Sequence, residues 1–116
     1  MLKSINRLKK RKEFNYIYKK GEIFHSNSFT MFVCKTYYHR PTIGISVSKQ
    51  VGNSVIRSRA KRIISEACRL NIQHFAKRNY VINAKDSIVD KSSKDVEVEL
   101  IKVLKKAGFY IETDIV

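Results

Sequence analysis

The fold is decided by residues 42–62, which read TIGISVSKQVGNSVIRSRAKR. Residues 42–48 alternate apolar with small polar side chains, and this period of two is typical of a half-buried strand. One face of that strand would hold Ile43, Ile45 and Val47, and the other Gly44, Ser46 and Ser48. We therefore expect a strand with one face in the core and an opposite face that is small, polar and open.

A long helix follows this strand, from about Ser54 to Ala76. Asn53 or Ser54 is suited to the N-cap position, because a short polar side chain there accepts a hydrogen bond from a free backbone N–H of the first turn. At helical spacing the apolar residues form one arc, Ile56, Ala60, Ile63, Ile64 and Ala67, and the basic residues spread over the other side, Arg57, Arg59, Lys61, Arg62 and Arg69. The pattern predicts one face in the core and one arginine-rich face.

Two elements are expected before this unit. Residues 9–20 place Phe14, Ile17 and Tyr18 at helical spacing and precede Gly21, which predicts a short helix that ends there. Residues 29–35 are rich in β-formers, and we expect them to form a hairpin with the strand at 42–48. Residues 22–26 are compatible with a short strand or a loop.

Two more elements are expected after it. Residues 80–84 are a strand candidate, and a last helix is expected from the N-cap Ser92, with Asp95 three residues on, to about Ala107 before Gly108. With no internal repeat or linker, we interpret residues 1–116 as one α+β domain in the order helix, two or three strands, helix, strand, helix.

The charge is unevenly distributed along the chain. Its 116 residues include 24 Lys and Arg against 10 Asp and Glu, a formal net charge of +14. Residues 1–78 hold 18 basic and 3 acidic residues, and residues 79–116 hold 6 and 7. Such a basic excess on a folded domain favours a polyanionic partner, either nucleic acid or an anionic membrane. No lipidation signal, membrane-spanning segment or secretory signal is apparent, so nucleic acid is the leading interpretation.

Protein-based catalysis finds little support in the sequence. Cys34 and Cys68 form no metal-ligand pattern, and we expect two reduced, half-buried thiols in a cytoplasmic protein. His25, His39 and His74 have no local catalytic partner and are interpreted as surface or RNA-facing residues. Carboxylates are scarce in the basic part of the chain, which argues against a self-sufficient metal nuclease.

Two groups of residues are candidate RNA contacts. Between Lys49 and Arg62, a loop with Gly and Asn leads into a helix with four cations, where backbone N–H groups and guanidinium groups could face the same phosphates; a solvated helix face is the alternative. Phe14, Tyr18 and Phe32, with Ser46 and Ser48, could line a groove that stacks single-stranded bases, although aromatic residues at helical spacing are more often core.

The order of these features resembles one family, the protein subunit of bacterial ribonuclease P. The residues that carry the resemblance are Arg7-Leu8-Lys9-Lys10 followed by Phe14 and Tyr18; Gly21 before the strand at Phe29; Gly44-Ile45-Ser46-Val47-Ser48-Lys49 with Gly52-Asn53; and Arg57-Ser58-Arg59-Ala60-Lys61-Arg62. The last two runs resemble the family's G-[IL]-S-V-S-K strand and its RNR helix, and residues 80–85 resemble its fourth strand.

The resemblance implies an α-β-β-β-α-β-α sandwich of the ribosomal protein S5 domain 2-like type, with a left-handed βαβ crossover. It implies an accessory subunit of an endoribonuclease whose RNA performs Mg²⁺-dependent removal of the 5′ leader from precursor tRNA. The chain would then hold no catalytic residue, no metal and no tightly bound cofactor. Its partners would be the catalytic RNA and the leader, with no membrane or protein partner.

The resemblance also implies site residues by position. The leader cleft would be formed by Arg7, Lys10, Phe14, Tyr18, Phe32, Ser46 and Ser48. The contacts of the RNR-like region to RNA would be Lys49, Asn53, Arg57, Ser58, Arg59, Lys61 and Arg62. Ser58 replaces the central Asn of the family's motif, Ser65 stands where a basic residue is frequent, and Lys85 where Arg is frequent. A structural ribosomal protein of similar fold is the alternative function, and a stand-alone nuclease is a third.

Overall fold

The computed structural model describes residues 2–36 and 39–112. Its helices and strands are α1 (Arg11–Lys20), β1 (Glu22–His25), β2 (Phe29–Lys35), β3 (Thr42–Ser46), α2 (Ser54–Leu70), β4 (Arg78–Ala84) and α3 (Ser93–Ala107). Short 3₁₀ turns lie at Ser4–Asn6, Lys49–Val51, Ile72–His74 and Asp86–Asp90. The expected α-β-β-β-α-β-α order is confirmed, and residues 22–25 are a strand.

The strands form one sheet in the order β1-β2-β4-β3. β4 pairs antiparallel with β2 and parallel with β3, so the expected hairpin between residues 29–35 and 42–48 is wrong. The hairpin joins β1 and β2 instead. The physical reason is burial on both faces: Val81 and Ile82 are 0% and 1% exposed, so β4 takes the centre of the sheet.

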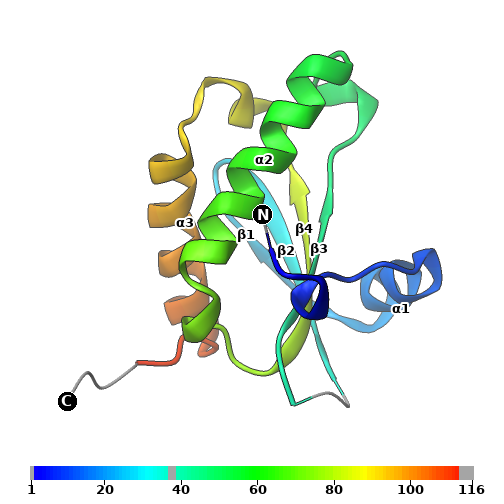
Figure 1. Ribbon diagram of the computed structural model, residues 1–116, viewed down its shortest axis with the longest axis vertical. Helices are drawn as coiled ribbons and strands as arrows, with labels where there is room; N and C mark the ends of the chain where they lie inside the picture. The colour runs from blue at the N-terminus through cyan, green and yellow to red at the C-terminus, as the bar shows by residue number, and fades with distance from the viewer. Residues whose placement is uncertain (1, 37–38, 113–116) are drawn as a thin grey trace.

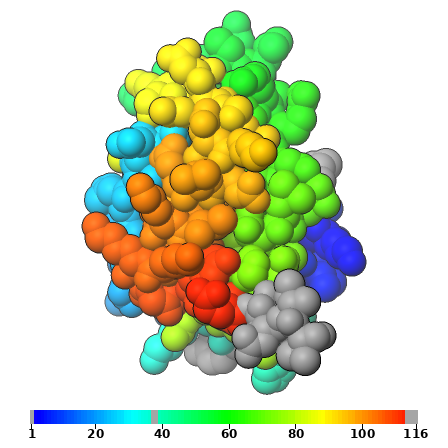
Figure 2. All heavy atoms as spheres, turned by 90° about the vertical axis from the view of Figure 1, so that its left-hand side faces the viewer, coloured from blue at the N-terminus to red at the C-terminus, as the bar shows by residue number. Residues whose placement is uncertain are grey.

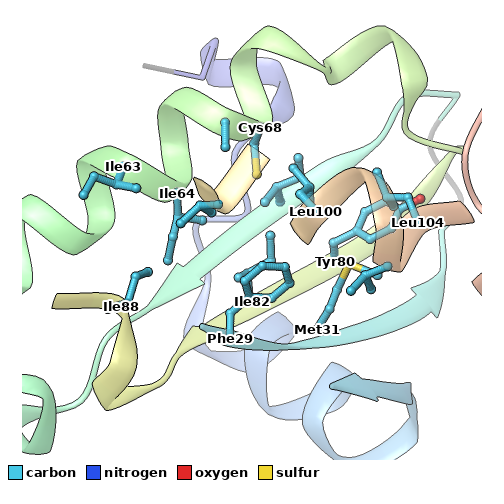
Figure 3. Close-up of a cluster of buried hydrophobic side chains, with 14 of the residues drawn as sticks. Phe29, Met31, Ile63, Ile64, Cys68, Tyr80, Ile82, Ile88, Leu100 and Leu104 are labelled. Atoms are coloured by element: carbon cyan, nitrogen blue, oxygen red, sulfur yellow. The ribbon is translucent and has the colours of Figure 1, made fainter. Parts of the chain in front are cut away.

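Helices cover both faces of the sheet (Figure 1). α2 and α3 pack on one face, where the main core forms, and α1 lies on the other. Figure 3 shows this core, with Phe29, Met31, Tyr80 and Ile82 from the sheet facing Ile64, Cys68, Leu100 and Leu104 from the helices. Cys68 is fully buried rather than half-buried, and burial raises the pKa of its thiol; Cys34 is half-buried, and both cysteines are free.

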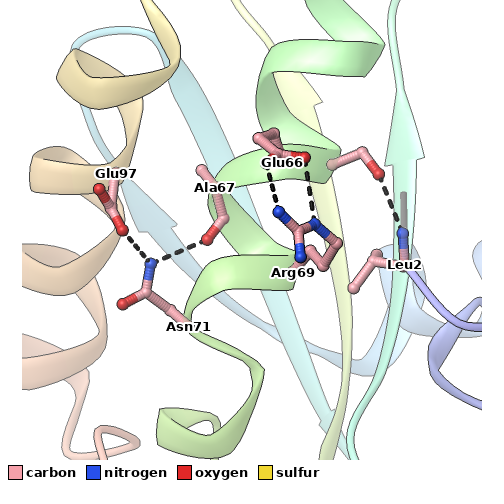
Figure 4. Close-up of polar contacts among 7 residues, drawn as sticks. Leu2, Glu66, Ala67, Arg69, Asn71 and Glu97 are labelled. Atoms are coloured by element: carbon pink, nitrogen blue, oxygen red, sulfur yellow. Dashed lines mark hydrogen bonds and ion pairs between the residues drawn. The ribbon is translucent and has the colours of Figure 1, made fainter.

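α2 ends at Leu70, six residues before the expected end, because Asn71 stops it. The Asn71 Nδ2 donates to the Ala67 carbonyl at 2.9 Å and to the Glu97 carboxylate of α3 at 2.8 Å (Figure 4). α3 starts with the expected capping box, in which Ser92 and Asp95 bond reciprocally, and ends at Gly108 with a φ of 82°. These end contacts fix the two helices relative to each other.

The N-terminal segment connects α2 to the free edge of β3. The Leu2 N–H donates to the Ser65 Oγ at 3.4 Å (Figure 4), and the Leu8 N–H donates to the Ile43 carbonyl at 3.0 Å. Ser65 thus serves as an anchor at a position where the family often has a cation.

The α3 side of the molecule carries much of the negative charge. Figure 2 shows this side, with α3 and α2 next to each other. Five acidic residues lie on α3 or on the 3₁₀ turn before it: Asp86, Asp90, Asp95, Glu97 and Glu99. Five lysines lie on α3 or directly before it as well, so this side is close to neutral: Lys91, Lys94, Lys102, Lys105 and Lys106. None of the described helices is long and apolar enough to cross a membrane.

Candidate nucleic-acid interface

α1 is held on the sheet by a small apolar cluster. Ile17 is 1% exposed and packs with Leu8 and Val81, and Phe14 and Tyr18 border this cluster from the same helix face. The i, i+3, i+4 spacing of Phe14, Ile17 and Tyr18 places all three on one side of the helix. Ile17 is therefore the buried residue of α1, and its aromatic neighbours remain partly exposed.

Gly44 allows the close approach of α1 to β3. A Cβ atom at this position would lie 2.6 Å from the Phe14 Cε1 and 3.1 Å from the Leu8 Cδ2. The strand face that we expected to be open is therefore covered at Gly44, and Ser46 is the position of β3 that borders open space beside α1. Glycine is needed here for space, since its φ is not positive.

Tyr18 connects α1 to two strands. Its hydroxyl donates to the Asn83 Oδ1 of β4 at 2.8 Å, and its ring meets Phe32 of β2 edge to face with centroids 5.0 Å apart. Asn83 was missed by the sequence reasoning, although strand alternation places it on the face opposite Tyr80 and Ile82. In register across the sheet, Asn83 pairs with Thr30 on one side and Ser46 on the other, which makes a polar row beside the aromatic residues.

A groove runs along one flank of α1, with a volume of about 460 Å³. Its lining residues are Lys9, Arg11, Phe14, Asn15, Tyr18 and Ser46, which we call the α1 groove. No carboxylate is among the described residues that line it. The hollow on the opposite flank is lined by Lys12 and Lys35 but also by Glu13, so a carboxylate is present on that flank and absent from the described lining of the α1 groove.

The α1 groove contains part of the predicted leader cleft. Phe14, Tyr18 and Ser46 line it, and Phe32 reaches it through Tyr18. Lys10 lies in a separate hollow with Arg40 and Thr42. Arg7 borders that hollow and also the one beside α2, and Ser48 is exposed beyond the end of β3. Lys9, Arg11 and Asn15 were missed; the seven-residue spacing from Arg11 through Asn15 to Tyr18 was the available signal, because it keeps them on one helix face.

The cations of α2 do not share one face. Arg59 donates to the carbonyls of Val89 and Lys91 at 3.2 and 3.1 Å, and so ties α2 to the 3₁₀ turn before α3. Ser58, Lys61 and Arg62 lie on the other flank, around a hollow that Arg7 also borders. The predicted arginine-rich face is thus divided between an intramolecular contact and an open basic surface.

The remaining predicted residues of this region surround the start of α2. Asn53 is the N-cap, as expected, with its Oδ1 accepting from the Ile56 N–H at 3.0 Å. Lys49 is exposed in the preceding 3₁₀ turn. Arg57 is half-buried, and its Nε has no hydrogen-bond partner among the described residues. Neither Lys49 nor Arg57 therefore forms an ion pair with another described residue.

Comparison with known proteins decides the family. The family model described as Ribonuclease P matches residues 2–108. The chain belongs to the ribonuclease P protein family. The ribonuclease P protein component of Clostridium botulinum strain 657 is 44% identical over 90% of this chain and 96% of its own length, and that of Clostridium beijerinckii is 40% identical over 96% and 95%.

Solved structures agree with this family assignment. The Staphylococcus aureus RNase P protein has a TM-score of 0.83 and 31% identity, over 91% of this chain and 98% of its own. The Thermotoga maritima RNase P protein has a TM-score of 0.79 over 92% and 98%, and at 24% identity it supports the fold alone. The chain is thus an accessory subunit of the ribonuclease P endoribonuclease, which matures tRNA 5′ ends, and a structural ribosomal protein is not favoured.

The cations beside α1 and α2 have few acidic partners among the described residues. Between described residues the one ion pair joins Arg69 and Glu66 at 2.5 Å, and the hydrogen bond from Arg69 lowers the pKa of Glu66. Neither residue lies in the α1 groove or among the predicted RNA contacts. The cations that border these surfaces therefore remain available to an RNA partner.

The described residues contain no group of three or more His, Cys, Asp or Glu side chains that could hold a metal ion. His74, expected to be a surface or RNA-facing residue, is partly exposed; its ring stacks on Tyr110 with centroids 4.7 Å apart, and its Nδ1 bonds the Ile111 carbonyl at 2.8 Å. Its role is to hold the C-terminal segment. His25 and His39 are exposed.

Proposed function

We propose that this ribonuclease P protein binds two RNAs through two surfaces. The α1 groove would hold the 5′ leader of precursor tRNA, and the exposed cations around α2 would bind the ribonuclease P RNA. The observation that carries the leader assignment is the meeting of Phe14 and Tyr18 with Lys9 and Arg11 on one flank of α1.

The α1 groove suits a single strand for two reasons. Partly exposed aromatic rings stack bases, and a stacked base contributes about 1–3 kcal/mol to binding. Lys9 and Arg11 would neutralise backbone phosphates next to those bases. Ser46 and Asn15 add hydrogen-bonding groups to the lining, and Asn83, next to Ser46 in the sheet, orients Tyr18 through its hydrogen bond.

The ribozyme surface would use Lys49, Asn53, Arg57, Ser58, Lys61 and Arg62. Arg59 would contribute mainly by holding α2 against residues 89–91, because two of its five N–H donors are already used there. Ser58 offers a hydroxyl in place of the amide of the family's usual Asn, so contacts at this position would be simpler.

We place the hydrolysis on the RNA subunit, with Mg²⁺ as the cofactor of the holoenzyme. The groove lining does not fit Mg²⁺, because this ion prefers carboxylate and phosphate oxygens and the lining carries cations. The chain itself would bind and orient the substrate, without a tightly bound cofactor, membrane contact or protein partner, in the cytoplasm.

Cleavage of precursor tRNA at low Mg²⁺ tests this function. Ribonuclease P RNA is assayed alone, with this protein, and with the protein in the absence of the RNA. We expect the protein to stimulate cleavage by the RNA and to be inactive alone. Cleavage by the protein alone would overturn the assignment of the chemistry to RNA, and a lack of stimulation would contradict the subunit role.

The ribozyme surface is tested separately with Arg62→Ala and the matched control Lys77→Ala, an exposed cation outside both surfaces. We expect Arg62→Ala to weaken assembly with the RNA and to lower the salt slope of binding by about one, because one phosphate contact is lost. Lys77→Ala should keep the wild-type slope. Equal slopes for all three proteins would place Arg62 away from phosphate.

A further inference from the structure

A second hollow lies between the N-terminal segment, β3 and α2, with a volume of about 440 Å³. We call it the N-terminal hollow. Its apolar lining includes Leu8 and Phe14 on the α1 side of β3 and Ile45 on the α2 side, and its rim includes Arg7, Lys61 and Arg62. Phe14 also borders the α1 groove, whereas Tyr18 and Asn83 do not reach the hollow.

The composition of the hollow combines two kinds of surface. The apolar lining is aromatic on one side of the β3 edge and aliphatic on the other, which suits the two faces of a planar ring. The rim carries three cations from two different segments, and no carboxylate is among the described residues that line it. An occupant with a flat apolar part and an attached anion would match both surfaces.

The edge of β3 adds hydrogen-bonding groups to this hollow. The Ile43 carbonyl points to the free edge of the sheet, where the Leu8 N–H donates to it at 3.0 Å. Strand geometry directs the N–H and carbonyl of Ile45, two residues later, to the same edge. No other described segment makes a backbone hydrogen bond to Ile45 there. A base edge that reaches this position would find one donor and one acceptor.

We propose that the N-terminal hollow binds one unstacked RNA nucleotide. Its base lies at the edge of β3 between Phe14 and Ile45, and its phosphate is held by Arg7, Lys61 and Arg62. This proposal rests on the chain's role as an RNA-binding subunit but does not require the leader to occupy the α1 groove. The nucleotide comes from the ribonuclease P RNA or from the leader, which share this chemistry.

The first experiment measures binding of adenosine 5′-monophosphate to the free full-length protein by NMR, with inorganic phosphate and adenosine as separate probes. We expect saturable shifts of the Ile43, Ile45 and Ser58 amides with the nucleotide, and affinities about tenfold weaker for each part alone, since stacking and charge both contribute. Equal affinity for phosphate and nucleotide would overturn the proposal, because it would show a general anion surface.

Variants locate the site. Ser58→Trp places a large side chain at the exposed rim and should abolish the nucleotide-dependent shifts. The milder Arg62→Ala should reduce them. Leu70→Trp, a similar change at an exposed position outside the hollow at the end of α2, is the matched control and should bind as the wild type does. Wild-type nucleotide binding by folded Ser58→Trp would overturn the proposal.

Cross-linking in the assembled holoenzyme identifies the source of the nucleotide. Single 4-thiouridine residues are placed in the ribonuclease P RNA or in the leader, and cross-links are mapped on the protein. Links to residues 43–45 or 58–65 from either RNA support the proposal, and links from neither overturn it. Tyr18→Ala separates the two ideas, because it should impair leader binding while the Ile45 and Ser58 shifts persist.

Discussion

Gly44→Ala perturbs the contact on which the α1 groove depends. The added methyl group would lie 2.6 Å from the Phe14 Cε1, and ordinary carbon–carbon contacts are about 3.5–4.0 Å, so the ring must withdraw by about 1 Å. The expected result is a Phe14 side chain displaced from the floor of the groove. The helix itself is held by Ile17, which does not touch Gly44 and keeps α1 on the sheet.

The net cost follows from two opposing effects. Overpacking of this kind costs about 1–3 kcal/mol, and replacing a strand glycine by alanine returns about 0.5–1 kcal/mol of backbone entropy. We therefore expect Gly44→Ala to lower the free energy of unfolding by about 1–2 kcal/mol. Displacement of Phe14 should also weaken binding of leader-containing substrate by about tenfold, as expected for the loss of one stacked base.

Urea unfolding and substrate affinity of the assembled holoenzyme measure the two effects. Phe14→Leu removes the ring atoms nearest the new methyl group, so the double variant Gly44→Ala, Phe14→Leu should recover stability relative to the sum of the single changes. A Gly44→Ala protein with wild-type stability and wild-type leader affinity would refute the reasoning, as would strict additivity in the cycle.

Three further outcomes are expected. Tyr18→Phe loses the hydrogen bond to Asn83 and should cost about 1 kcal/mol in urea unfolding; an unchanged midpoint would show that the bond contributes nothing. Arg59→Ala should destabilise the free protein by about 1 kcal/mol, because two hydrogen bonds to carbonyls are lost, whereas Arg62→Ala should stay within about 0.5 kcal/mol of wild type. Equal stabilities of the two variants would contradict the role of Arg59 in holding α2 against residues 89–91. Burial raises the pKa of Glu99, but hydrogen bonds from Ser26 and Ser28 outweigh it, and the net pKa is lowered. A lowered folded-state pKa stabilises the fold above the unfolded value of about 4.3, and this stability is lost as the pH falls through the folded pKa; Glu99→Gln should therefore flatten the decline in stability below about pH 4.3, and an identical decline would contradict this role.

Local patterns were sufficient for much of the fold. The N-caps Asn53 and Ser92, the stop at Gly108 and the two-sided strand at β3 are each determined by residues within a few positions of one another. Such short-range chemistry is readable in sequence because the partners are adjacent. The same holds for the aromatic spacing of α1, which placed Phe14 and Tyr18 together.

Contacts between distant segments could not be predicted. The insertion of β4 between β2 and β3 depends on which strand is buried on both faces, which no local pattern reveals. Tyr18 and Asn83 are 65 positions apart, and Arg59 finds its carbonyl partners 30 and 32 positions later. For that reason the prediction from the sequence named Arg59 as an RNA contact and did not name Asn83.

The placement of the basic N-terminal residues could not be predicted for the same reason. Lys9, Lys10 and Arg11 are consecutive, so composition alone could not separate them. The turn into α1 directs Arg11 to the groove and Lys10 to the hollow beside Arg40, and Lys9 lies between them and borders both. The direction depends on where α1 meets the sheet, which Gly44 and Ile17 decide.

The central claim, that the α1 groove holds the leader, is tested most directly by holoenzyme affinity for precursor tRNA and mature tRNA. The measurement compares wild type, Tyr18→Ala and the control Lys77→Ala. Tyr18→Ala should weaken precursor binding by about tenfold, the loss expected for one stacked base, with mature tRNA unchanged. Equal losses for the two RNAs, or no loss for the precursor, would contradict the claim.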